Sequence, residues 1–169
     1  MPTENIQKKS PVVAPPKENA VRELIRTFGL LERVMQTYFA RFGISGSQWG
    51  VLRNLHRAEQ QGLSGLRLTD LGNRLLISPP SVTGVVDRLV RAGLVVRCGS
   101  PTDLRTKRVG LTREGRNLVD RVLQVHEKQI NTVLGPLAEG EREELQRLLA
   151  KLGQHLQELN TRGETAQVF

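Results

Sequence analysis

The residues whose chemistry stands out lie on one predicted helix, Ser78–Gly93. One face of this helix is small at its start and cationic at its end, with Ser81, Gly84, Arg88 and Arg91. Small polar groups ahead of arginines suit a helix whose N-terminal end enters a DNA major groove. The alternative is an ordinary amphipathic helix with a solvated outer face, and this stretch alone does not decide between the two.

The local sequence explains why a helix should form here. We expect the Ser78 hydroxyl to cap it, Pro79 and Pro80 to occupy its first turn, and Gly93 to end it in the left-handed conformation. The opposite face should be buried, because its apolar residues repeat at helical spacing; these are Val82, Val85, Val86 and Leu89.

Two strand-like segments follow the helix. Leu94–Cys98 is a short apolar run of strand type, Lys107–Leu111 is a second strand candidate, and the turn-rich loop Gly99–Thr106 separates them. A helix followed by a hairpin with a charged tip is typical of a winged helix. Alternation along the first strand places Leu94, Val96 and Cys98 on one face, which we expect to be buried.

In this arrangement the chain resembles the MarR family of bacterial transcriptional regulators. The matching fragments occur in the family's order and spacing; they are Leu68–Gly72, Ser81–Thr83, Asp87–Leu89, Gly93–Val95, Asp103–Arg105 and Leu111–Gly115. The resemblance covers about Ala20–Asn160. It implies a mainly α protein, a winged helix-turn-helix with long N- and C-terminal helices forming a dimerisation region.

The pattern along the chain gives a predicted division into five segments. These are a disordered tail over 1–18, a dimerisation helix within 19–46, the DNA-binding domain at 47–112, C-terminal dimerisation helices over 113–160, and a tail at 161–169. Three caps are predicted for the helices after the first: Ser47, Thr69 and Thr112. Leucines at heptad-like spacing over Leu145–Leu159 favour a helix that packs against another element, and the resemblance implies that this element belongs to a second copy of the chain.

The resemblance also implies roles for the residues around the helix and the wing. Ser78, Pro80, Ser81 and Thr83 should approach base edges, because hydroxyls and apolar groups can both contact bases in the major groove. Phosphate contacts are expected from Arg88, Arg91, Lys107 and Arg108. Asp103 and Arg105 match the family's wing motif, in which the arginine enters the minor groove and the aspartate orients it.

Composition supports this interpretation and argues against several others. The net charge is +8, and residues 67–113 hold nine bases against three acids, whereas residues 114–169 hold seven against nine. A basic patch at the helix and wing is what phosphate binding requires. Three scattered histidines and one cysteine favour neither a metal site nor a disulfide, and no catalytic or cofactor motif stands out. We expect no cofactor, no enzyme activity, no membrane span, and a cytoplasmic location.

Two sites remain open at this stage. Cys98 is either a redox-sensing thiol or a buried and inert one, and the strand alternation favours the latter. Family members bind small aromatic acids between the dimer region and the DNA-binding lobe, so Tyr38, Trp49 and Arg53 form a candidate effector pocket. Plain core packing is the alternative for these aromatic residues.

These observations predict a homodimeric, sequence-specific double-stranded DNA-binding regulator, with a pseudo-palindromic operator. The expected mode of action is repression that a small aromatic effector relieves. The alternative is a winged-helix module that binds another protein and has no salt-dependent affinity for DNA.

The wing motif makes the first testable prediction. Arg105→Ala should weaken operator binding by about 1–3 kcal/mol per wing, and should lower the salt slope of log affinity by about one unit per wing. Asp103→Ala should cause a smaller loss. Fluorescence-anisotropy titrations over a salt series measure both quantities, and unchanged affinity and slope for Arg105→Ala would remove the wing from the mechanism.

Overall fold

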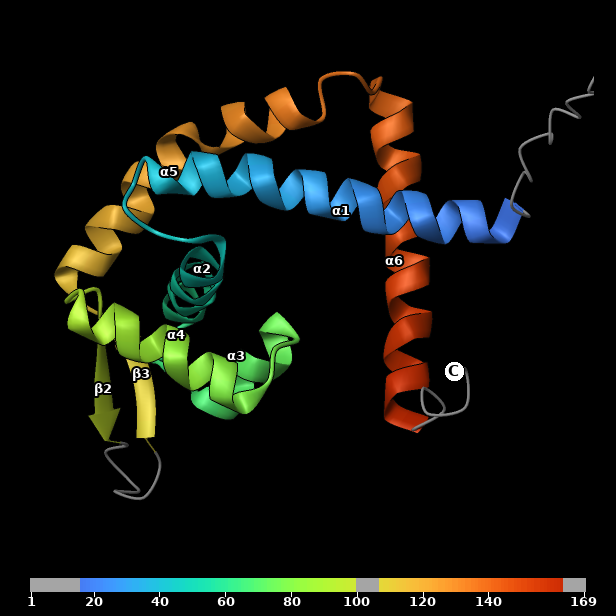
Figure 1. The fold of residues 1–169 in the computed structure, drawn as a ribbon. Coiled ribbons are helices and arrows are strands. Elements are labelled where there is room, and N and C mark those ends of the chain that lie inside the picture. The colour runs from blue at the N-terminus through green and yellow to red at the C-terminus, as the bar shows by residue number, and fades with distance from the viewer. Residues whose placement is uncertain (1–15, 100–106, 163–169) are drawn as a thin grey trace, which may run out of the picture. The chain divides into compact units, whose positions relative to one another are not determined.

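The computed structural model describes residues 16–99 and 107–162 and is mainly helical (Figure 1). The chain divides into two compact units, Met1–Val119 and Asp120–Phe169, and the boundary falls within one helix. The first unit contains α1 (Pro16–Ala40), α2 (Gly46–Gln60), β1 (Leu66–Arg67), α3 (Leu68–Leu75), α4 (Pro79–Arg91), β2 (Val95–Gly99), β3 (Lys107–Leu111) and the start of α5 (Arg113–Val133). The second contains the rest of α5 and α6 (Glu139–Arg162). Within the described part of the chain, no helix is long and apolar enough to cross a membrane.

The helix-turn-helix forms where the sequence predicts it, with α3 and α4 joined by a short turn. Leu76 ends α3 in the left-handed conformation at φ 54°, and its side chain is exposed. The predicted cap at Thr69 is wrong, because α3 begins one residue earlier, at Leu68. The Asp70 carboxylate accepts a hydrogen bond from the backbone N–H of Arg67 at 3.3 Å and so pairs the orphan donor at this end.

The start of α2 shows a similar shift. The cap is Ser45 rather than the predicted Ser47. The Ser45 hydroxyl accepts from the N–H of Gln48 at 3.2 Å, and the Gln48 side chain accepts from the N–H of Ser45 at 2.8 Å. This reciprocal capping box pairs two backbone donors at once, whereas Ser47 would pair one.

The wing is a three-stranded antiparallel sheet in the order β1-β3-β2. Leu66 of β1 pairs with Val109 of β3, and Val95 of β2 pairs with Leu111. The predicted buried face of β2 is wrong: Val95 is buried, Val96 is 44% exposed, and Cys98 is half-buried. Val95 points inward because its partner Leu111 belongs to the core, and the side chains next to it in the strand must then face the other way.

The core of the first unit lies beneath α4 and the sheet. It is built from α2, α3, α4, the strands and the start of α5, with Leu52, Leu55, Leu71, Val82, Val86, Leu89, Val109 and Val119 almost wholly inaccessible to solvent. The end of α1 joins this core through aromatic contacts. The Phe39 ring lies 5.5 Å from that of Trp49 between centroids, and 5.0 Å from that of Tyr38.

The connection from β3 to α5 depends on two polar contacts and one glycine. The Thr112 hydroxyl accepts from the N–H of Gly115 at 3.0 Å and donates to the carbonyl of Gly93 at 2.7 Å, so the predicted cap is confirmed. A Cβ atom on Gly115 would lie far inside the contact radius of the Leu94 carbonyl oxygen. The turn that ends α4 and the first turn of α5 can therefore approach this closely only with glycine at 115.

The second unit shows how α6 begins and which face it exposes. The Glu141 carboxylate accepts from the N–H of Ala138 at 2.8 Å, which places the helix start at Glu139 rather than at the predicted Glu141. The predicted leucine stripe is present on α6. Leu159 is half-buried, and the other members are between 37% and 51% exposed in the single chain: Leu145, Leu148, Leu149, Leu152 and Leu156.

Gly115→Ala should destabilise the protein by about 1–3 kcal/mol, because the added methyl group must push apart backbone segments rather than a flexible side chain. Urea unfolding measured at fixed protein concentration checks this. The matched control is Gly140→Ala in the first turn of α6, where a Cβ atom would meet no atom within 4 Å. Equal stability of the two variants would show that the close approach at Gly115 is relieved at no cost.

Candidate nucleic-acid interface

α4 presents two faces of opposite character, and the buried one fixes the direction of the other. Val82, Val85, Val86 and Leu89 are all at most 4% exposed. The outward face contains all of the helix residues predicted to contact DNA, each of them exposed: Ser78, Pro80, Ser81, Thr83, Arg88 and Arg91. The structure therefore brings these residues together on one accessible surface.

The hydroxyls at the start of α4 are already partly engaged. Ser78 occupies the cap position, but its hydroxyl makes no capping bond, so that part of the prediction is wrong. Pro79 and Pro80 at the first two helix positions remove the nearest backbone donors. The Ser78 hydroxyl instead pairs with that of Ser81 at 2.9 Å. The Thr83 hydroxyl donates to the Pro79 carbonyl at 3.0 Å, which leaves Thr83 able to accept from a ligand and to offer it a methyl group.

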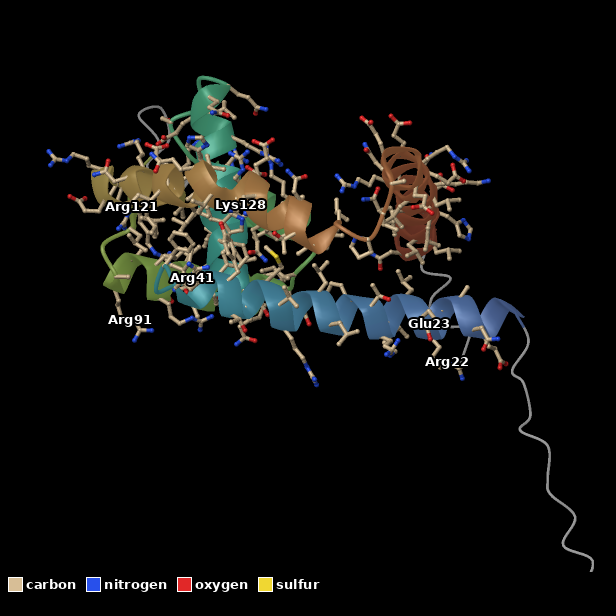
Figure 2. All side chains as sticks on the ribbon, turned by 90° about the horizontal axis from the view of Figure 1, so that it is seen from above. Arg22, Glu23, Arg41, Arg91, Arg121 and Lys128 are labelled. Atoms are coloured by element: carbon tan, nitrogen blue, oxygen red, sulfur yellow. The ribbon has the colours of Figure 1, made fainter. Side chains whose placement is uncertain are left out.

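The cations of α4 lie in its last two turns. Within the described residues, neither Arg88 nor Arg91 forms an ion pair, and Arg91 extends outward from the C-terminal end of the helix (Figure 2). Arginine at this end is also favourable with respect to the helix dipole. Both guanidinium groups thus remain available for anionic partners.

Asp87 is the acidic residue of α4, and it serves a different purpose. The Arg97 side chain of β2 donates to the Asp87 carboxylate at 2.5 Å, which links α4 to the wing. Sequence reasoning missed this pair, although a lone acid on a basic helix was a signal that it had a cationic partner. The Arg97 side chain is therefore paired with a residue of the same chain.

The structure describes only some of the residues predicted to act in the wing. Arg108 is half-buried, and its guanidinium donates to the Gly65 carbonyl at 3.2 Å, so one of its five N–H groups serves the fold. The backbone of Lys107 begins β3, but its side chain lies outside the described part of the protein. Asp103 and Arg105 lie outside the described residues altogether.

The candidate effector residues belong to, or adjoin, the aromatic core. Tyr38 and Trp49 are 5% and 8% exposed, and burial raises the pKa of the Tyr38 phenol. Arg53 lies within hydrogen-bonding distance of the His56 ring, at 3.2 Å between Nη1 and Nδ1. Burial, and then the nearby charge of Arg57, lower the pKa of the Arg53 side chain. Among the described residues, no cluster of three or more His, Cys, Asp and Glu side chains is arranged to hold a metal ion.

Comparison with known proteins identifies the family of this chain. The MarR family model matches residues 42–106, which include α2, β1, α3, α4 and β2. The HTH-type transcriptional regulator FarR of Neisseria gonorrhoeae is 33% identical over 118 residues, covering 70% of this chain and 77% of that relative.

Two solved structures share the fold at comparable similarity. The S. aureus MepR–DNA complex has a TM-score of 0.69 at 25% identity and covers 79% of this chain and 96% of that one. Bordetella bronchiseptica BpsR, whose DNA binding is regulated by 6-hydroxynicotinic acid, has a TM-score of 0.69 at 26% identity and covers 80% and 98%. The family model, the identity to FarR and the shared fold agree, and the chain belongs to the MarR family of winged helix-turn-helix transcriptional regulators.

Proposed function

We propose that the protein is a homodimeric repressor that reads a pseudo-palindromic DNA operator through α4 and the wing and is released by a small-molecule effector. The exposed face of α4 carries the proposal. It combines hydroxyls near the helix start with two arginines near its end that form no ion pair with any described residue, and the opposite, apolar face is buried. The structural similarity to a MepR–DNA complex supports DNA as the partner.

The arrangement along α4 assigns different tasks to its two ends. Ser78, Pro80, Ser81 and Thr83 would approach base edges, where hydroxyl and apolar contacts carry sequence information. Arg88 and Arg91, together with Lys107 and Arg108 of β3, would hold phosphates and set the register without reading sequence. Asp103 and Arg105 of the wing would contact the minor groove.

The dimer is supported by apolar surface on the two terminal helices. On α1, the side chains of Val21, Leu24, Ile25, Phe28 and Leu31 are between 40% and 66% exposed in the single chain. The leucine stripe of α6 is exposed as well. Contiguous apolar surface of this kind marks an interaction site, and we assign 19–46 and 113–160 to dimerisation and 47–112 to DNA binding.

We propose that the effector is a small aromatic acid. Regulation of BpsR by 6-hydroxynicotinic acid supports a small aromatic acid as the class of ligand. Tyr38 and Trp49 offer two aromatic rings to such a ligand, and Arg53 offers a cation for its carboxylate. Such a ligand would act by shifting the population of DNA-binding dimers, which requires different affinities for the two states.

Selection of bound duplexes from random DNA tests the function as a whole. We expect enrichment of an inverted repeat whose half-site centres lie about one helical turn apart, because a two-fold dimer presents two α4 helices. Affinity for the selected site should fall steeply with salt. If no sequence is enriched and the protein shows no salt-dependent affinity for DNA, the protein-interaction alternative is favoured.

Arg91→Ala should weaken binding to selected and unrelated DNA alike, because a phosphate contact is independent of sequence. The slope of log affinity against log salt should fall by about one unit for each protomer. The matched control is Arg147→Ala on α6, whose guanidinium is paired with Glu144 at 2.6 Å. An identical slope for wild type and Arg91→Ala would remove Arg91 from the interface.

Leu152→Asp should disrupt the dimer, because it places a carboxylate in the leucine stripe at a cost of about several kcal/mol. Sedimentation velocity should show monomers, and specific DNA binding should be lost while the helical circular dichroism remains. Gln157→Asp, at an exposed polar position on the same helix, should leave the dimer intact. A stable Leu152→Asp dimer that binds DNA would contradict the assignment of α6.

A further inference from the structure

Gly84 lies within the outward part of α4, and no contact with the described residues requires a glycine there. Among the described residues outside the helix backbone and the two chain neighbours, a Cβ atom at this position would meet the end of the Arg88 side chain, at 3.7 Å, which is ordinary van der Waals contact. Glycine within a helix destabilises it relative to alanine, because the unfolded chain has more freedom to lose. The protein therefore retains a costly residue where its own packing would accept a methyl group.

Gly72 shows what a glycine required by packing looks like in the same unit. A Cβ atom there would lie 3.3 Å from a methyl carbon of Val82 and 3.4 Å from the carbonyl oxygen of Ile77. Gly72 thus permits the close approach of α3 to α4. Gly115 in the same way permits the close approach of α5 to the turn at Leu94. Gly84 opens outward instead, so the close approach that it permits must come from outside the chain.

The space at Gly84 has a definite chemical character. The glycine borders a hollow of about 580 Å³. Its apolar lining comes from Ile77, Pro80 and Val85, and its polar lining comes from Ser47, Ser81 and Arg88. The Arg88 guanidinium is the described group that a Cβ atom at Gly84 would meet, and it suits a polar ligand, whereas a phosphate would leave the hydrocarbon of the hollow without a partner. A polar ligand that carries a small apolar group at its edge fits both parts of this lining.

We propose that Gly84 is a specificity-determining residue, and that the space it leaves receives the C5-methyl group of a thymine. Thymine is the unmodified base that presents a methyl group in the major groove, and apolar contact with that group distinguishes it from the other bases. This inference rests on the proposed placement of α4 in the major groove. Pro80 and Val85 supply the hydrocarbon that the methyl group contacts, and Ser81 flanks it with a hydroxyl.

The methyl group can be removed from the DNA without changing base pairing. In the selected operator, each thymine of a half-site is replaced in turn by deoxyuridine, and affinity is measured by fluorescence anisotropy. Burial of one methyl group corresponds to about a fourfold change in affinity. We expect one thymine position to show a loss of about fourfold per half-site, and about 16-fold when both half-sites are changed.

Gly84→Ala then tests whether Gly84 forms the methyl site. The alanine methyl group would occupy the space assigned to thymine, so the variant should bind the thymine operator more weakly and should no longer distinguish it from the deoxyuridine operator. Its melting temperature should rise by roughly 2–4 °C, because alanine favours the helix. Gly140→Ala, which fills open space on α6, should keep the full thymine preference of the wild type.

The outcomes separate this inference from the proposed function. If selection yields an operator but deoxyuridine has no effect at any position, or if Gly84→Ala retains the full thymine preference, the methyl site is wrong and the DNA-binding function stands. If selection yields no operator, the proposed function itself fails. A thymine preference in the wild type that disappears in Gly84→Ala, together with a raised melting temperature, establishes the site.

Discussion

The burial of one apolar face of α4 is the constraint on which the rest of the structure depends. Val82, Val86 and Leu89 are fully buried, and the helix packs against α2, α3 and β2 through this face. Successive residues of a helix differ in direction by about 100°. Once the valines are inside, Ser81, Gly84 and Arg88 must face outward. The chemistry of the proposed DNA surface therefore follows from the packing of the core, and a change in helix rotation would remove it.

Polar contacts outside the core then place the wing relative to α4. Arg97 joins β2 to Asp87 at 2.5 Å, and Arg108 joins β3 to the carbonyl of Gly65 at 3.2 Å. Thr112 closes the hairpin against Gly93, at the end of α4. The exposed ion pair of Arg97 with Asp87 contributes little free energy. The effect of the three contacts is geometric, because each one ties an element of the sheet, or the residue after it, to α4 or to a segment that flanks the helix-turn-helix.

The exposed faces of the protein carry two different costs that only a partner can offset. The leucines of α6 and the apolar side chains of α1 remain in water in the single chain, which is unfavourable for so much hydrocarbon. Gly84 destabilises α4 without any benefit to internal packing. Under our proposals, a second protomer covers the apolar side chains of α1 and α6, and a DNA base occupies the space beside Gly84. The protein would then reach its most favourable state only as a dimer on its operator.

The sequence by itself determined most of the features that depend on neighbours along the chain. Helical spacing identified the buried face of α4, Gly93 was correctly placed in the left-handed region at φ 69°, and Thr112 was correctly identified as a cap. Local rules failed at two helix starts. The capping box of Ser45 and Gln48 replaced the expected cap at Ser47, and the Ser78 hydroxyl pairs with that of Ser81, because Pro79 and Pro80 lack backbone donors. Several candidates were chemically adequate in each case, and the sequence could not rank them.

Tertiary structure alone decided the features that depend on residues distant in the sequence. The inward face of β2 follows from the pairing of Val95 with Leu111, which no alternation within one strand can reveal. The engagement of Arg97 and Arg108, and the separate reasons for Gly115 and Gly84, likewise required knowledge of what lies across the fold. Local patterns determine which residues share a face of an element, but contacts between elements determine which face is covered and which cations remain free.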